Sequence, residues 1–223
     1  MSRIVLFLLV VGLTISACTI PVRYEEGSGV LVTEQRDVSG FERVSFEGIG
    51  TLIVTPGSEE SLSIEAEDNI MPRIETKVRA GTLEIGFDTS RWQDIVRPTK
   101  NITYTLTVVT LEGINLSGAG SIKAQDIEAD RFDIGLSGAG SIEISGSAES
   151  MEISVSGAGS FDGGEFMTER ADVNISGAGN ATIWATESLD VNISGVGNVS
   201  YYGDPQVDKT ISGLGNIKAL GSP

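Results

Sequence analysis

The phrase LSGAGSI occupies residues 116–122 and recurs letter for letter at residues 136–142. Looser copies follow at 155–161, 175–181, 193–199 and 211–217, and the successive Ser-Gly pairs are separated by 20, 19, 20, 18 and 18 residues. A repeat of about twenty residues is typical of a solenoid, in which each repeat forms one coil and stacks on the next. The repeat therefore constrains the fold more than any other feature of the chain.

Apolar residues alternate with small or polar ones on both sides of each Ser-Gly pair. Ile134 and Leu136 precede Ser137 with Gly135 between them, and Ile142 and Ile144 follow. Alternation with a period of two indicates a strand that buries one face. We therefore predict an all-β fold, a β-solenoid with about 18–20 residues per coil, in which each coil is strand, glycine corner and strand.

Stacked coils lie about 4.8 Å apart, so equivalent residues form columns along the solenoid axis. We expect the two glycines of each corner to adopt positive φ angles, which glycine tolerates. The corner glycines are Gly118, Gly120, Gly138, Gly140, Gly157, Gly159, Gly177, Gly179, Gly195 and Gly197. The residue between the two glycines is expected to point inward and fill the core, and it is Ala119, Ala139, Ala158, Ala178, Val196 or Leu214. Asn180, Asn198 and Asn216 follow the second glycine and are predicted to stack as a hydrogen-bonded ladder.

A Gly-x-Gly phrase also occurs in dinucleotide-binding sites, but the rest of that pattern is missing. The fingerprint needs a third glycine three residues on and a helix that follows it. Here a strand pattern follows every copy of the phrase, so a structural role is favoured over a nucleotide site.

The first residues have the pattern of an export signal. Met1–Arg3 is a short basic start, and residues 4–15 form an apolar run too short to cross a bilayer as a helix. The run ends in Ile15-Ser16-Ala17-Cys18, which resembles the lipobox of bacterial lipoproteins, and Cys18 is the single cysteine of the chain. We expect cleavage before Cys18 and lipidation of that residue, which would hold the protein to the bilayer on the exported side of the bacterial cell envelope. The alternative is an ordinary cleaved signal.

These signals divide the chain into a lipoprotein signal peptide (1–17), a lipidated tether (18–29) and one domain (30–223). The tether contains Pro21, Gly27 and Gly29 and is expected to be extended or disordered. Removal of residues 1–17 takes away Arg3, so 14 of the 15 basic side chains remain against 31 acidic ones, a formal charge of −17. Such a surface repels nucleic acid.

Weaker copies of the repeat precede it, at VSFEGIGTLIV (44–54) and VRAGTLEI (78–85). We expect the solenoid to begin there with irregular coils. Together with Ser39-Gly40-Phe41, the acidic segment 65–69, and the SGAG, GVGN and GLGN phrases, these stretches resemble the family called putative auto-transporter adhesin, head GIN domain. The resemblance covers about residues 30–220 and implies a single-stranded right-handed β-helix on bacterial envelope proteins, often lipoproteins, without an established activity.

The composition excludes several kinds of catalytic site. The chain has no histidine and no cysteine besides Cys18, which removes the usual zinc sites and histidine-based triads. Carboxylates do fall into register four residues before each of the last five Ser-Gly pairs. This acid column contains Asp133, Glu152, Asp172, Asp190 and Asp208. By parity the column faces solvent. It predicts either a calcium site or, in the favoured interpretation, a solvated acidic face whose repulsion Arg131 and Arg170 relieve.

A second column lies eight residues after the serine and contains Trp184, Tyr202 and Leu220. Trp184 and Tyr202 could stack against sugar rings, or all three could cover the end of the solenoid. Lys209, Lys218, Pro205 and Pro223 also fit protection of that edge.

The function favoured by these patterns is a non-enzymatic envelope lipoprotein, an adhesin or ligand-binding module whose repetitive face binds a glycan or an envelope protein. The alternative is a carbohydrate-active enzyme, a polysaccharide lyase or glycoside hydrolase on a β-helix scaffold. A groove that places arginine or lysine against the acids would favour the enzyme, and a flat ladder face would favour the binding module.

Overall fold

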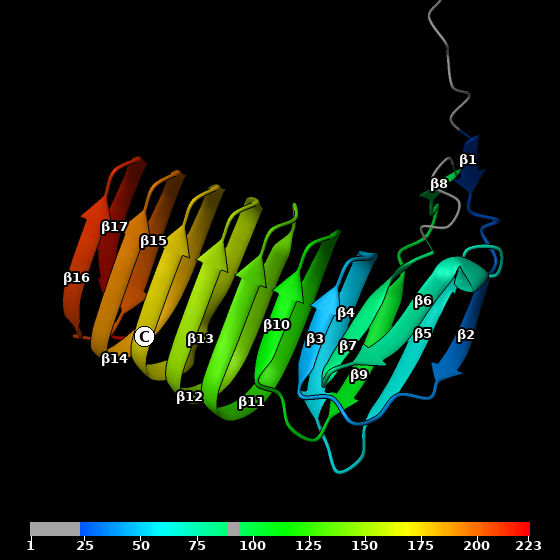
Figure 1. Ribbon diagram of the computed structural model, residues 1–223, viewed down its shortest axis with the longest axis horizontal. Helices are drawn as coiled ribbons and strands as arrows, with labels where there is room; N and C mark the ends of the chain where they lie inside the picture. Colours follow the sequence, from blue (N-terminus) through cyan, green and yellow to red (C-terminus); the bar gives the residue numbers. More distant parts are fainter. Residues whose placement is uncertain (1–22, 89–93) are drawn as a thin grey trace, which may run out of the picture.

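A computed structural model describes residues 23–88 and 94–223 of the chain. The described part is almost entirely β-structure, wound into a solenoid whose coils follow one another along the long axis (Figure 1). The strands are β1 (Arg23–Glu26), β2 (Leu31–Arg36), β3 (Arg43–Phe46), β4 (Ile49–Pro56), β5 (Ser61–Glu67), β6 (Ile74–Arg79), β7 (Thr82–Phe87), β8 (Asp94–Arg97), β9 (Thr103–Val108), β10 (Gly113–Leu116), β11 (Ala119–Leu136), β12 (Ser141–Val155), β13 (Ala158–Ile175), β14 (Ala178–Ile193), β15 (Val196–Tyr202), β16 (Gln206–Ile211) and β17 (Leu214–Gly221), with a 3₁₀ helix η1 (Met71–Arg73). The predicted β-solenoid is confirmed.

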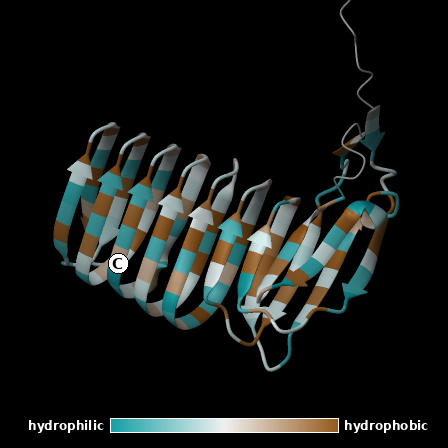
Figure 2. Ribbon diagram, viewed as in Figure 1, coloured by the Kyte–Doolittle hydropathy of each residue, from teal (hydrophilic) through white to brown (hydrophobic). Residues whose placement is uncertain are grey.

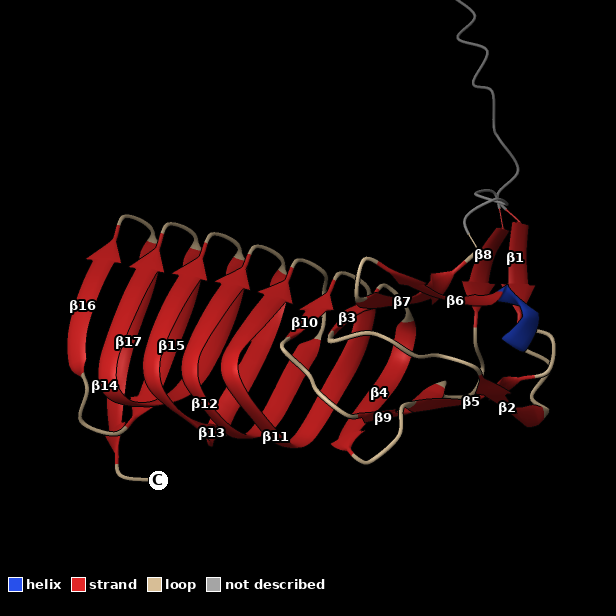
Figure 3. Ribbon diagram, turned by 60° about the horizontal axis from the view of Figure 1, so that its bottom comes forward, coloured by secondary structure: helices blue, strands red, loops and turns tan. Residues whose placement is uncertain are grey.

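Each coil contributes to two layers, which the Ser-Gly corner joins. We call layer A the strands that precede the corner, which are β3, β10, the second halves of β11–β14 and β16. Layer B contains the strands that follow the corner, which are β4, the first halves of β11–β14, β15 and β17. Strands β11–β14 are long because each bends from layer B into layer A without a break (Figure 3).

The repeats stack in parallel and in register, so the apolar residues of successive coils form continuous columns. One core column contains Val44, Ile114, Ile134, Ile153, Val173 and Val191, all at most 3% exposed. The alternating bands along each strand in Figure 2 are the period-two pattern that predicted these strands. The core therefore lies between the two layers and runs along the whole solenoid.

The corner glycines are required for a reason other than the one predicted from the sequence. None of the glycines of the Ser-Gly-x-Gly corners has a positive φ, so the expectation of left-handed backbone is wrong. Instead, a Cβ on Gly138 would lie 2.0 Å from the carbonyl oxygen of Gly118, and one on Gly177 would lie 2.2 Å from that of Gly157. The stacked corners approach so closely that only hydrogen fits at this position.

Left-handed backbone occurs at the opposite bend of the coil. Asp126 (φ 54°) and Gly146 (φ 130°) lie where β11 and β12 pass from layer B to layer A. Both lie beside shifts in strand register, which indicates β-bulges. The two bends of a coil are thus built differently, one by close packing of glycines and one by bulges.

The residue between the two corner glycines points outward, so the expectation that it fills the core is also wrong. All six members of this column are exposed, and exposure reaches 56% at Val196 and 74% at Leu214. The reason is parity: Ile122 is buried, so Gly120 faces inward and Ala119 faces solvent. The second glycine, rather than the alanine, lies against the core, where a Cβ on Gly179 would lie 2.7 Å from a methyl of Val155.

The two weaker copies of the repeat have different structures. VSFEGIGTLIV forms a true coil, with Val44 opposite Ile114 and Gly50 opposite Gly120. VRAGTLEI instead forms the β6–β7 hairpin, in which Val78 pairs with Leu83 in antiparallel fashion. Ala80 and Gly81 both have positive φ, as a two-residue hairpin turn requires, so this stretch is not a solenoid corner.

Antiparallel strands close the N-terminal end of the solenoid, as the prediction of irregular first coils anticipated. Layer B continues through β9, β5 and β2, and layer A continues through β7 and β6. Strands β1 and β8 pair with each other beside this end (Figures 1 and 3). A hairpin joins β6 and β7, whereas the antiparallel pairs β2–β5 and β5–β9 bring together strands that are not consecutive in the chain.

A buried carboxylate holds the N-terminal segment on this end. Glu67 is 1% exposed and accepts hydrogen bonds from the backbone N–H of Gly29 (2.7 Å), Thr99 (2.8 Å) and Lys100 (3.3 Å) and from the Thr99 hydroxyl. Asn69 accepts from the N–H of Ser28 and donates to the carbonyl of Glu26. The part of the predicted tether that the structure describes, residues 23–29, is therefore bound to the domain.

We expect Glu67→Gln to loosen this attachment at neutral pH. Burial alone would raise the pKa of Glu67, but the hydrogen bonds from Thr99, Gly29 and Lys100 outweigh burial and hold that pKa below its ordinary 4.5. A carboxyl with a lowered pKa stabilises the fold above its unfolded-state value and loses this contribution as pH falls through its folded-state value. The melting temperature of the variant should therefore lie below that of the parent at pH 7, and the gap should close as pH falls below 4.5.

Glu65→Gln is the matched control, because Glu65 lies two residues away on the same strand with an exposed side chain. It should leave the melting temperature unchanged across this range. Equal melting curves for Glu67→Gln and Glu65→Gln would contradict the stabilising role of the Glu67 carboxylate.

Candidate functional site

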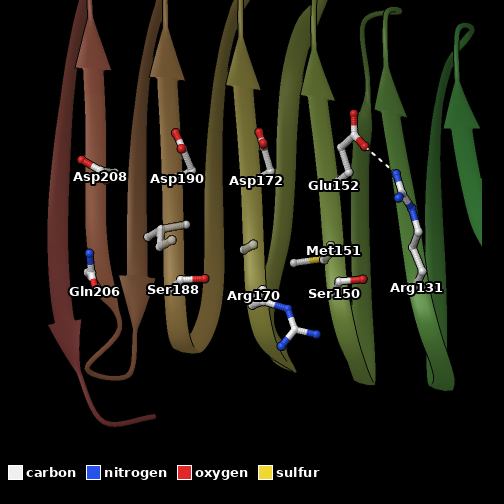
Figure 4. A pocket seen from close by; sticks show the side chains of 12 residues that line it. Arg131, Ser150, Met151, Glu152, Arg170, Asp172, Ser188, Asp190, Gln206 and Asp208 are labelled. Atoms are coloured by element: carbon white, nitrogen blue, oxygen red, sulfur yellow. Dashed lines mark hydrogen bonds and ion pairs between the residues drawn. The ribbon is translucent and has the colours of Figure 1, made fainter.

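The acid column predicted from the sequence forms one row on the outer face of layer A. Asp133 lies opposite Glu152, Glu152 opposite Asp172, Asp172 opposite Asp190, and Asp190 opposite Asp208. Figure 4 shows the last four carboxylates in this row, each on its own coil. The neighbours Phe132 and Ile134 are 0% and 3% exposed, so the parity that predicted an outward-facing column holds.

A second row runs beside the acid column, two residues earlier on each strand. It consists of Arg131, Ser150, Arg170, Ser188 and Gln206, which are paired in the same register. The sequence patterns indicated the two arginines but not the row, because its members differ in chemical type from coil to coil. Hydroxyl, amide and guanidinium groups thus lie beside carboxylates along several coils (Figure 4).

Arg131 connects two members of the acid column. Its Nε lies 3.0 Å from Asp133, and its terminal nitrogen lies 2.7 Å from Glu152. The hydrogen bond with Asp133, followed by the charges of Asp133 and Glu152, raises the pKa of Arg131 above its ordinary value. Arg43 adds a contact of 2.9 Å to Asp133. The repulsion expected between stacked carboxylates is therefore relieved at the first two positions by arginine.

The remaining members of the column are arranged differently. Asp172 accepts a hydrogen bond from Asn174, whereas Asp190 and Asp208 form no hydrogen bond or ion pair with any described residue. Arg170 does not bind the acid column but lies 3.2 Å from Glu169 and 3.4 Å from Glu187. Its predicted role in relieving repulsion thus applies to neighbouring acids on the bend.

The outer face of layer A is hollowed along this row. One hollow of about 480 Å³ is lined by Arg131, Ser150, Glu152, Arg170, Asp172, Ser188 and Asp190 among others. A second, of about 590 Å³, extends toward the β6–β7 hairpin and is lined by Arg43, Arg79, Asn115, Asp133, Glu152 and Ser154 among others. Glu152 lines both, so the two hollows adjoin, and we call them together the layer A groove.

The calcium hypothesis gains no support from the geometry. Over residues 23–88 and 94–223, no three acidic or cysteine side chains converge closely enough to hold a metal ion. Calcium prefers six to eight oxygen ligands around one point, whereas the acid column offers about one carboxylate per coil. Calcium binding therefore stays a prediction.

The aromatic column lies on the other layer from the acid column. Trp184 pairs with Tyr202 in adjacent strands of layer B, as the sequence predicted. Leu220 leaves this column, because a shift in register places Gly221 opposite Tyr202. The two rings are half-buried, and a Cβ on Gly164 would lie 3.2 Å from the Tyr202 ring, so that ring lies over the glycine. The structure thus separates the aromatic pair from the acids, and sugar stacking stays a prediction.

The asparagine column contains one ladder rung. Asn198 donates a hydrogen bond of 3.0 Å to Asn180 across adjacent coils, and Ser121 donates one of 3.2 Å to Thr51 at the other end of the same column. Asn216 lies in register with Asn198, but the pair forms no side-chain hydrogen bond within the described residues. Cys18 lies outside the described residues. No helix in the described part of the chain is long and apolar enough to span a membrane.

These features define a class of protein: a two-layered β-solenoid, capped at its N-terminal end, whose outer face carries ordered polar rows. The family of such domains described as "Putative auto-transporter adhesin, head GIN domain" matches residues 40–205. Because this match covers most of the chain, the chain belongs to that family, as its motifs indicated.

Solved structures with a similar fold include proteins from Bacteroides and Parabacteroides species. A "putative adhesin" from Bacteroides fragilis is 26% identical, with a TM-score of 0.72 over 88% of this chain and 100% of that chain. A "putative adhesin" and a "putative lipid binding protein", both from Parabacteroides distasonis, are 19% and 22% identical, each with a TM-score of 0.52. They cover 88% and 89% of this chain and 100% of their own, and they show the shared fold. No curated protein matches the chain.

Proposed function

We propose that the protein is a non-enzymatic adhesive module of the bacterial cell envelope that binds an extended glycan along the layer A groove. The observation that carries this proposal is the pair of parallel rows, in which each coil places one carboxylate beside one hydroxyl, amide or guanidinium group. An extended polymer of hydroxyl-rich units presents repeating donors and acceptors of its own. A site with the same kind of translational repeat can bind several units at once, which gives avidity to weak single contacts.

The alternative, a carbohydrate-active enzyme, has one feature in its favour, since Arg131 does lie against two acids. However, enzymes close their active sites against water, which strengthens the electrostatic interactions of the catalytic groups. The side chains of Arg131 and Glu152 are 64% and 50% exposed, so the groove does not exclude water from them. Binding without cleavage is therefore the function that this geometry supports better.

The experiment that tests the proposal measures binding of the mature chain to immobilised bacterial and host glycans, with calcium and with chelator, while products of cleavage are followed. We expect saturable binding without products. Asp172→Asn combined with Ser188→Tyr should weaken binding at least tenfold, because the first removes an acceptor and the second fills the groove. Asp162→Asn on the outer face of layer B is the control and should bind like the parent.

Each outcome separates the alternatives. Release of products would replace the binding module by the enzyme. Binding that survives the groove variants but is lost in Trp184→Ala would move the site to the aromatic pair on layer B. Binding that needs calcium would support the cation hypothesis for the acid column, and no binding to any glycan would contradict the proposal.

A further inference from the structure

Exposed apolar side chains gather at the two ends of the solenoid. At the C-terminal end, Ile211 is 41% exposed, Leu214 74% and Leu220 37%. At the N-terminal end, the edge strands β2 and β6 expose Leu31 (44%) and Val78 (37%) among others. Exposed apolar groups clustered at sheet edges indicate a surface for association with another protein.

Both ends also present unpaired strand edges in the same two layers. Within the described residues, β16 pairs only with β14 and β6 only with β7, and these are the edges of layer A. Strand β17 pairs only with β15 and β2 only with β5, and these are the edges of layer B. Each end therefore offers two rows of free backbone groups that could extend the sheet.

The C-terminal edge carries a cation on its core-facing side. Lys209 lies opposite Val191, which is fully buried, so the lysine occupies a position that is apolar in every earlier coil. Val207 and Ile211 flank it on the same side of β16, opposite Leu189 and Ile193. Lys209 forms no ion pair with any described residue, whereas Arg43, Arg131 and Arg170 all do.

The N-terminal edge carries an anion on the core-facing side of the other layer. Glu34 of β2 lies opposite Ile64, which is fully buried, so the glutamate also occupies the core-facing side of its edge strand. Its side chain is 48% exposed and lies 3.4 Å from Arg36. Arg36, opposite the buried Leu62, lies on the same side of β2 and pairs with Glu34. Where the core would continue, the N-terminal edge thus carries an ion pair, and the C-terminal edge carries Lys209, which forms no ion pair with any described residue.

We propose that copies of this chain associate head to tail, with the C-terminal coil of one copy docked on the N-terminal edge strands of the next. In this arrangement β17 pairs with β2 of the next copy in parallel, and β16 pairs with β6 of the next copy in antiparallel fashion, as the strand directions within each layer dictate. The apolar ends cover each other, and Lys209 faces Glu34 of the next copy across the two layers. Facing layers lie about 10 Å apart, a gap that an extended lysine and glutamate side chain span together.

Such a contact joins two different surfaces, so it leaves a free end on every assembly and can extend into a row of copies. The layer A groove would then continue from one copy to the next. The inference rests on the ends of the solenoid and is independent of what the groove binds.

The test is sedimentation velocity of the mature chain over a wide range of concentration, with Cys18→Ser to leave out the lipid. We expect the parent to form larger species as concentration rises. Lys209→Glu and Glu34→Lys should each weaken association at least tenfold, because like charges then meet in the junction. The double variant should associate like the parent. An equimolar mixture of the two single variants should also associate, since each junction between unlike variants pairs Lys with Glu.

Lys218→Glu is the matched control, because Lys218 lies on the same terminal coil but opposite Ser200, on the outward side. It should leave association unchanged, and circular dichroism should show all variants folded. A parent that remains monomeric at every concentration would overturn the proposal and leave Lys209 as a charge that protects the edge. Dimers that resist Glu34→Lys would overturn it in favour of a tail-to-tail contact.

Discussion

Gly177→Ala is expected to destabilise the fold by about 3 kcal/mol or more, since inserting even one methyl group into packed structure costs about 1–3 kcal/mol and here the obstacle is backbone. The new Cβ would lie 2.2 Å from the carbonyl oxygen of Gly157 and 2.3 Å from that of Ser156. Neither oxygen can move without moving its coil, because Ala178 donates to the carbonyl of Gly157 across the stack. Gly177→Val, with a larger side chain, should be worse.

Gly86→Ala is the matched control. It also adds a methyl group to a strand glycine without positive φ, but the new Cβ would meet Glu47 at an ordinary contact distance of 3.4 Å. Urea unfolding followed by circular dichroism measures both variants. If Gly177→Ala unfolds at the same urea concentration as Gly86→Ala, the close stacking of the corners is not what requires glycine.

Cys18→Ala is expected to transfer the protein from the membrane fraction to the soluble fraction almost completely. We propose that acyl chains on Cys18 are the anchor, and each buried methylene contributes about 0.8 kcal/mol to membrane binding. The mature chain has a formal charge of −17, so anionic headgroups would repel rather than retain it once the lipid is gone. Membrane fractionation with immunodetection measures the change.

Thr19→Ala is the control for this variant, since it alters the adjacent residue but leaves the cysteine in place. It should remain with the membrane. Retention of Cys18→Ala in the membrane fraction after a high-salt wash would contradict the lipid anchor and favour another mode of attachment.

Much of the solenoid was predictable because its pattern is local and repeated. The spacing of the Ser-Gly pairs gave the length of a coil, and alternation around Ile134 and Ile153 gave the buried face. The register of the acid column followed from the same count, since equal positions in successive repeats must lie side by side. The outward direction of Ala119 could have been found by counting parity from Ile122, two residues past Gly120.

The candidate site was predictable only in part. The acid column and the Trp184–Tyr202 pair were located correctly, but their placement on different layers follows from the corner between them. The row from Arg131 to Gln206 could not be recognised from a repeated residue type, because its members differ chemically from coil to coil. Glu67 was not recognised, because its donors lie 38 and 32 residues away in sequence.

The sequence by itself determined the coil, its length, its buried face and the columns. Side chains of a strand alternate between its two faces, and equivalent residues of successive repeats stack, so both features follow from stretches of about twenty residues. Only the tertiary structure decided why the corners need glycine, since that depends on the carbonyl of the preceding coil rather than on the glycine's own backbone angles. It also decided the antiparallel N-terminal end, the bound carboxylate of Glu67 and the opposite charges of Glu34 and Lys209 at the two edges. Those features arise from contacts between residues that are far apart in the chain, whose pairing no local pattern specifies.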